Sequence, residues 1–148
     1  MKINKWDQIG VVVKDVEGAA RFLEERLGIG PVTILELNDC HARYKDREID
    51  YKLKVGLTSV GEVALELIEV VDGDPILRDF LPPSGHGVHH LGVYVQDLEK
   101  AVRDWQAAGG KILQRGSFMK GGGSAYLYTP EKIGILVELI QFPKPEEK

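Results

Sequence analysis

The sequence predicts an α+β protein in which two βαβββ modules form an open eight-stranded cup with the helices outside. An internal repeat carries this prediction. Residues 8–17 match residues 90–99 without a gap. Further along each half, the sequence Glu-Leu-Ile occurs at residues 66–68 and again at residues 138–140. Either match alone could arise by chance, but two matches in the same order indicate a duplicated module.

Each module begins with a strand of alternating residues, at 8–13 and 90–95, because successive side chains of a strand point to opposite faces. An aspartate follows each strand, Asp15 or Asp97, where a carboxylate suits the N-terminal end of a helix. Apolar residues then recur at helical spacing, and glycines end both helices. Three more strands are expected in each module, at 32–37, 49–57 and 62–70 and at 111–115, 125–128 and 134–142.

The two modules are expected to form one domain, with residues 1–72 in the first module and residues 88–148 in the second. Residues 73–87 link them. A short helix is expected to begin at Asp74 and Pro75, because proline is favoured in the first turn of a helix.

The composition of the chain excludes several classes of partner. With 19 Lys and Arg against 23 Asp and Glu, the net charge is -4, which argues against a broad nucleic-acid surface. No apolar run approaches the roughly 20 residues that span a membrane, and the N-terminus lacks an apolar signal core. The single cysteine, Cys40, forms no intrachain disulfide. We therefore expect a cytoplasmic protein without nucleic-acid or membrane partners.

Four polar side chains interrupt the apolar strands on the sheet face opposite the helices. A carboxylate buried there is costly unless it is paired or binds a cation. One amide oxygen, one imidazole and two carboxylates suit Zn, Ni, Co or Mn, and two carboxylates balance the charge of a divalent ion. Each residue alone could be an ordinary strand residue, but their symmetric placement favours a metal site. The four are Gln8, Glu66, His90 and Glu138, and strand alternation places the neighbouring His89 on the helix side.

These segments resemble the vicinal-oxygen-chelate superfamily, which includes glyoxalase I and methylmalonyl-CoA epimerase. The similarity covers nearly the whole chain and is most specific at residues 7–15, 74–81, 89–93 and 134–141. It implies that the same four polar residues are the metal ligands. The second and last segments are most similar to the epimerase. The ligand set instead resembles that of zinc-dependent glyoxalase I, because epimerases have histidine at the position of Gln8. The chain lacks the Asn-Trp-Gly stretch that follows the first glutamate of that glyoxalase.

The resemblance also implies roles in proton transfer. In this family the metal binds two neighbouring oxygens of a substrate while a proton leaves the adjacent carbon. Glu138 would act as base as well as ligand, and the epimerase pattern, counted back from Glu66, selects Asp50 as a second base. From the residues alone, Asp50 could equally lie on a solvated strand face. A glycine-rich segment that resembles the epimerase substrate loop, or else forms a plain turn, contains Gly122, Gly123 and Ser124.

The expected function is that of a metal-dependent isomerase or epimerase. It would transfer a proton at a carbon next to a carbonyl group of a small molecule, and an acyl-CoA is one candidate substrate. A glyoxalase I-like lyase acting on a thiol adduct is the alternative enzyme. Non-catalytic binding of a small molecule, as in resistance proteins, is the alternative from another class. A ring-cleaving dioxygenase is less favoured, because its iron site needs two histidines and only His90 lies at a ligand position. Family analogy implies a homodimer.

Overall fold

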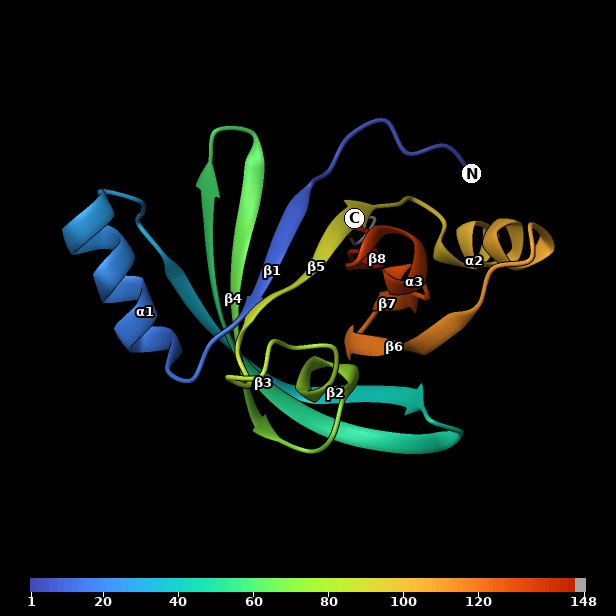
Figure 1. The fold of residues 1–148 in the computed structure, drawn as a ribbon, viewed down its shortest axis with the longest axis horizontal. Helices are drawn as coiled ribbons and strands as arrows, with labels where there is room; N and C mark the ends of the chain where they lie inside the picture. The colour runs from blue at the N-terminus through green and yellow to red at the C-terminus, as the bar shows by residue number, and fades with distance from the viewer. Residues whose placement is uncertain (146–148) are drawn as a thin grey trace.

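The computed structural model describes residues 1–145, and the last residues of the predicted second module, 146–148, lie outside the described residues (Figure 1). The first module consists of β1 (Gln8–Val12), α1 (Val16–Phe22), the π-helical turn η1 (Leu23–Leu27), β2 (Thr33–Tyr44), β3 (Arg47–Val60) and β4 (Val63–Asp72). The linker holds the 3-10 helix η2 (Ile76–Arg78). The second module consists of β5 (Gly87–Tyr94), α2 (Leu98–Ala107), β6 (Ile112–Met119), β7 (Gly122–Leu127), α3 (Pro130–Ile133) and β8 (Leu136–Gln141). Within residues 1–145, every helix is too short or too polar to span a bilayer.

The strands pair in a closed ring in the order β1-β4-β3-β2-β6-β7-β8-β5. Within each module the first strand lies parallel to the last, β1 to β4 and β5 to β8. The modules join where β1 pairs antiparallel with β5 and where β2 pairs antiparallel with β6. The predicted eight-stranded cup of two βαβββ modules is confirmed, and the pairing of β2 with β6 closes its wall into a barrel. Figure 1 shows α1 and α2 outside the sheet, at opposite ends of the molecule.

The β2–β3 hairpin is longer than the sequence pattern predicts. β2 continues past residue 37 to Tyr44, and β3 starts at Arg47 after a tight turn. Lys45 and Asp46 form this turn with positive φ angles of 52° and 60°. The added segment of β2 alternates between the buried side chains of Cys40, Ala42 and Tyr44 and the exposed side chains of His41 and Arg43. The pattern of a half-buried strand was therefore present in the sequence but was overlooked.

The core is divided between the barrel interior and the outer side of the sheet. On the outer side, α2 packs against the second module through Leu98, Ala101 and Val102. Ile76 of η2 packs with residues of β7 and β8, and its neighbour Leu77 packs with the interior of the first module, so η2 is held between the modules. The interior of the first module is filled by Val12, Tyr51, Leu53, Val55 and Ile68. The apolar side chains of β3 therefore face into the barrel.

α1 and α2 each begin after an aspartate, as predicted, and the last strand of each module also caps the helix of that module. The Asp97 side chain accepts a hydrogen bond from the first turn of α2, whereas the Asp15 side chain makes no capping bond. Glu69 of β4 accepts a hydrogen bond from the backbone N–H of Val16 at 3.1 Å. Gln141 of β8 accepts the corresponding N–H of α2 at 2.8 Å. The same repeat position thus ties each helix to its sheet.

Replacing Glu69 by alanine removes the acceptor for the Val16 N–H. We expect the free energy of unfolding to fall by about 1–2 kcal/mol, the usual cost of a lost cap or an unsatisfied buried donor. Glu69→Gln keeps an acceptor oxygen and should stay within about 0.5 kcal/mol of wild type. Urea unfolding measures both variants, and equal midpoints for the two would contradict the capping role.

Candidate metal centre

The four residues predicted as metal ligands come from four neighbouring strands of the barrel. β4, β1, β5 and β8 follow one another in the ring. In that order they carry Glu66, Gln8, His90 and Glu138. The structure therefore brings all four residues together across the junction of the two modules.

Two glycines make room for these side chains. Gly10 stands opposite both Glu66 and His90 in the strand pairing, and Gly92 stands opposite both Gln8 and Glu138. A Cβ atom on Gly10 would lie 2.2 Å from Cε1 of the imidazole, and one on Gly92 would lie 2.9 Å from the Cβ of the glutamine. The repeated order of a ligand, an apolar residue and a glycine therefore creates the space that the polar groups occupy.

The polar groups pair only partly with one another. Gln8 Nε2 donates a long hydrogen bond of 3.4 Å to Glu66 Oε2. His90 Nε2 lies 2.9 Å from Glu138 Oε2, but the two are not aligned as a hydrogen bond. Among residues 1–145, three buried side-chain polar atoms have no hydrogen-bond partner, and two of them, Gln8 Oε1 and His90 Nε2, belong to this site. Because buried polar atoms are normally paired, the site lacks a partner for both.

The electrostatics of the site favour an added positive charge. Burial, followed by the nearby Glu138 carboxylate, raises the pKa of Glu66, and because His90 and Gln8 only partly offset this, the pKa is about 7. Burial would lower the pKa of His90, but the adjacent Glu138 and the more distant Glu66 raise it above its ordinary value. Two carboxylates in a confined space therefore compete for a single cationic partner.

The donor set fits a divalent ion, although the side chains do not yet converge on one. His90 Nε2 and Glu138 Oε2 face each other at 2.9 Å, and imidazole nitrogen and carboxylate oxygen are both ligands of Zn2+ and similar ions. Within residues 1–145, no three His, Cys, Asp or Glu side chains meet around a single ion position. Binding an ion with all four residues therefore requires side-chain rotation.

A cavity of about 80 Å³ opens from these residues into the barrel. Gln8, Glu66 and Glu138 line one part of it together with Ser124 and the two tyrosines of the interior. The rest of its wall is apolar and includes Leu35, Leu37, Leu53, Val55, Phe118 and Phe142. Among residues 1–145, no lysine or arginine lines the cavity. It can accept the reactive end of a small molecule but not a whole large ligand.

The structure does not bring Asp50 to this site. Its carboxylate is 85% exposed and lies 2.5 Å from Nδ1 of His41 on the outer side of the hairpin. The expectation that Asp50 acts as a second base assumed that the polar side of β3 faces the substrate. Instead the apolar side of β3 faces inward, and Tyr51, the next residue, lines the cavity.

The predicted substrate loop is part of a strand. Gly122, Gly123 and Ser124 begin β7, and the turn before it is confined to residues 120–121. Ser124 lines the cavity, whereas a Cβ on Gly123 would approach Leu98 of α2 on the outer side. Of the three residues, only Ser124 lines the cavity beside the candidate metal ligands.

Three residues near the site were missed by the sequence interpretation. His89 is 1% exposed and its ring lies against His90, rather than on the helix side. A β-bulge between β1 and β5 breaks the alternation at this position, and nothing in the sequence marks it.

Tyr51 and Tyr126 face the interior. Burial first, then neighbouring acidic groups, raise the pKa of both hydroxyls, so both stay protonated. The alternation of apolar residues along β3 could have identified Tyr51 as a residue that faces the interior.

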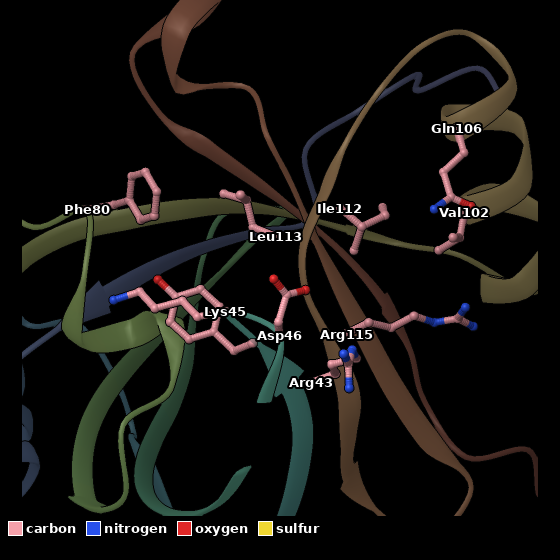
Figure 2. A pocket seen from close by; sticks show the side chains of 10 residues that line it. Arg43, Lys45, Asp46, Phe80, Val102, Gln106, Ile112, Leu113 and Arg115 are labelled. Atoms are coloured by element: carbon pink, nitrogen blue, oxygen red, sulfur yellow. The ribbon is translucent and has the colours of Figure 1, made fainter. Parts of the chain in front are cut away.

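A second pocket, of about 500 Å³, lies on the outer surface between the β2–β3 turn, α2 and β6 (Figure 2). Arg43, Lys45 and Arg115 line it, with Phe80 on another side. Each of these cations already contacts a carboxylate: Glu48, Asp79 and Glu99, respectively. None of the four candidate ligands lines this pocket, so the chemistry expected of them belongs to the interior cavity.

Comparison with known families agrees with this architecture. Residues 7–128 match the family model described as the Glyoxalase/Bleomycin resistance protein/Dioxygenase superfamily. The chain therefore belongs to this superfamily, as its resemblance to the vicinal-oxygen-chelate proteins predicted.

Known proteins similar to this chain include enzymes of two kinds. A hypothetical protein from Bacillus halodurans C-125 superposes with a TM-score of 0.68 at 22% identity, covering 99% of this chain and 100% of that chain. Methylmalonyl-CoA epimerase from Mycobacterium tuberculosis gives a TM-score of 0.67 at 21% identity, covering 95% and 88%. A lactoylglutathione lyase from Arabidopsis thaliana is 36% identical over 63 residues, which are 42% of this chain and 22% of the plant protein. The two superpositions establish the fold, and the lyase match spans less than a quarter of the lyase.

The raised pKa of Glu66 makes stability depend on pH when metal is removed by a chelator. A carboxyl whose pKa is higher in the folded than in the unfolded chain stabilises the fold at low pH, and this contribution is lost as pH rises from about 4.5 to about 7. Glu66→Gln removes that loss. Its stability relative to wild type should therefore rise by roughly 2 kcal/mol between about pH 5 and about pH 8.

Urea unfolding at the two pH values measures this difference. Glu62→Gln, at an exposed turn between β3 and β4, is the matched control and should show no such trend. A pH-independent difference between Glu66→Gln and wild type would show that the ionised Glu66 carboxylate is not disfavoured by its surroundings.

Proposed function

We propose that this protein is a metal-dependent isomerase or epimerase that moves a proton at a carbon next to a carbonyl group. The observation that carries the proposal is the group of two carboxylates, one imidazole and one amide beside a largely apolar cavity, with two of its donor atoms unpartnered. Gln8 Oε1, His90 Nε2 and one carboxylate oxygen each of Glu66 and Glu138 would hold a Zn, Ni, Co or Mn ion. Such an ion would draw electron density from two neighbouring substrate oxygens and acidify the adjacent carbon.

The side chains of the cavity supply the proton transfer. Glu138 lies beside the imidazole of His90 and is paired with Tyr126 in the neighbouring strand β7. Its carboxylate can take the proton from the substrate carbon. Glu66 occupies the equivalent position in the other module, so its carboxylate is the second group that can return a proton. Tyr51 stays protonated and can donate a hydrogen bond to a substrate oxygen. The apolar wall keeps water away from the exchanging carbon.

A glyoxalase I-like lyase acting on a thiol adduct is the second candidate. It is favoured by the 36% identity with a plant lactoylglutathione lyase over 63 residues and by glutamine rather than histidine at position 8. The epimerase candidate is favoured by superposition over nearly the whole chain, including on a methylmalonyl-CoA epimerase in complex with methylmalonyl-CoA and NH4+. Both reactions use the same proton transfer and differ in the substrate.

The size of the cavity suggests how a large substrate would bind. With about 80 Å³ available, only the reactive end of an acyl-CoA or thiol adduct would enter, and its remainder would lie outside the barrel. Assembly as a homodimer stays a prediction from family analogy.

The metal hypothesis predicts that His90→Ala loses binding of Zn2+ by a hundredfold or more, because a central ligand is removed. Titration of the chelator-treated protein with Zn2+ against a chromophoric competitor measures the affinity. Asp50→Asn should leave it unchanged, since Asp50 lies outside the barrel. Equal affinity in wild type and His90→Ala would reject this ligand set.

The proton-transfer hypothesis is tested by exchange of solvent deuterium into the α-carbon of acyl-CoA substrates and thiol adducts. Glu138→Gln should reduce exchange by roughly a hundredfold or more, the usual scale for a general base. Asp50→Asn makes the same carboxylate-to-amide change outside the barrel and should keep full exchange. An equal loss in both variants would contradict the assignment of the interior carboxylate. Tight binding without exchange in wild type would favour a non-catalytic binding protein.

A further inference from the structure

A chain of two hydrogen bonds connects the backbone of the linker to the candidate ligand His90. His89 Nε2 lies 3.0 Å from the carbonyl oxygen of Ile76, and His89 Nδ1 lies 2.9 Å from Nδ1 of His90. Both histidines are fully buried, with exposures of 1% and 0%. His89 reaches this position because it is the extra residue of the bulge between β1 and β5, where Gly10 pairs with His90 and Val11 pairs with Val88.

The chemistry of the donors and acceptors fixes where the protons lie. A carbonyl oxygen only accepts, so His89 Nε2 must donate to Ile76. His89 is fully buried, and its two ring nitrogens are hydrogen-bonded to the Ile76 carbonyl and to His90. The ring is therefore neutral, and because its one proton is on Nε2, its Nδ1 carries none. That nitrogen must accept a hydrogen bond from Nδ1 of His90. The remaining ring nitrogen of His90, Nε2, is the one that faces Glu138.

We infer that His89 is a positioning residue that holds the proton of His90 on Nδ1, fixes the orientation of its ring, and so presents Nε2 as the ligand atom. This inference rests on the proposed metal function and identifies the residue that prepares its histidine. An imidazole coordinates a metal through one nitrogen, and a partner on the other nitrogen selects the tautomer and the ring orientation.

The surroundings of the two rings support this role. Tyr126 packs edge-on against both, with ring centroids 5.8 Å from His89 and 5.3 Å from His90, while the bare backbone of Gly10 lies against the other side of His90. The repeat provides a useful contrast. At the position before Gln8 stands Asp7, whose carboxylate accepts a hydrogen bond from the backbone N–H of Tyr94 at 2.8 Å. A glutamine has no tautomers to select, and Asp7 does not link Gln8 to the backbone as His89 links His90 to Ile76.

The hydrogen bond between the histidines can be observed directly, with or without metal. A nitrogen–hydrogen–nitrogen bond transmits a scalar coupling between its two nitrogen nuclei. In 15N-histidine-labelled protein treated with a chelator, we expect a coupling between the Nδ1 atoms of His89 and His90, with the proton assigned to His90. A proton on Nδ1 of His89, or no coupling between the two nuclei, would overturn the inference.

Two substitutions separate positioning from packing. His89→Phe keeps a ring against Tyr126 but offers no acceptor, whereas His89→Asn places an amide oxygen near the former Nδ1 position. We expect the Zn2+ affinity to fall about 10- to 100-fold in His89→Phe, as for other residues that orient metal ligands, and to change less than about threefold in His89→Asn. Urea unfolding of each variant checks that both are folded.

The outcomes distinguish the two hypotheses. Wild-type affinity in a folded His89→Phe protein would overturn the positioning role, and so would equal losses in the two variants. If wild type binds no Zn2+, the proposed function fails, whereas the coupling between the histidine nitrogens still decides whether His89 sets the tautomer of His90.

Discussion

Two carboxylates held inside a largely apolar barrel set the main constraint on this protein. Charge in such surroundings is costly unless it is paired or neutralised. The protein meets part of this cost with internal contacts, His90 beside Glu138 and Gln8 beside Glu66, and with a pKa of Glu66 raised to about 7. These contacts still leave two buried donor atoms without partners. A divalent cation would balance both carboxylates and give each of these atoms a bond, which is the reason for proposing a metal centre here.

The duplicated module explains how such a site can be built. Each copy contributes one candidate ligand on its first strand, one glycine two residues later, and one glutamate on its last strand. When β1 pairs with β5, each ligand on one strand lies opposite the glycine of the other. The same duplication supplies the side chains that cap α1 and α2 from β4 and β8. The geometry of the site is therefore a consequence of pairing two nearly equivalent strands. The copies also differ: His89 contacts the ring of His90, whereas Asp7, at the corresponding position, accepts a hydrogen bond from the backbone of Tyr94.

The repeat made much of this predictable. Matches between residues 8–17 and 90–99 fixed the first strand and helix of each module, and strand alternation placed the four polar side chains on a common face. Two expectations failed for identifiable physical reasons. Asp50 was placed on the assumption that the polar side of β3 faces the substrate, whereas the apolar side of this strand lines the barrel interior. His89 was placed by alternation across a bulge, which is a property of how two distant strands pair and is absent from either strand alone.

The most direct test of the metal centre is anomalous diffraction from crystals of the protein loaded with one equivalent of Co2+ or Zn2+. We expect one ion per chain inside the barrel. Its ligands should be Gln8 Oε1, His90 Nε2 and carboxylate oxygens of Glu66 and Glu138, at about 2.0–2.2 Å. His89 Nδ1 should still accept the proton on the opposite nitrogen of His90. An ion bound only on the outer surface, for example at His41 and Asp50, or an interior without an ion at saturating metal would contradict it.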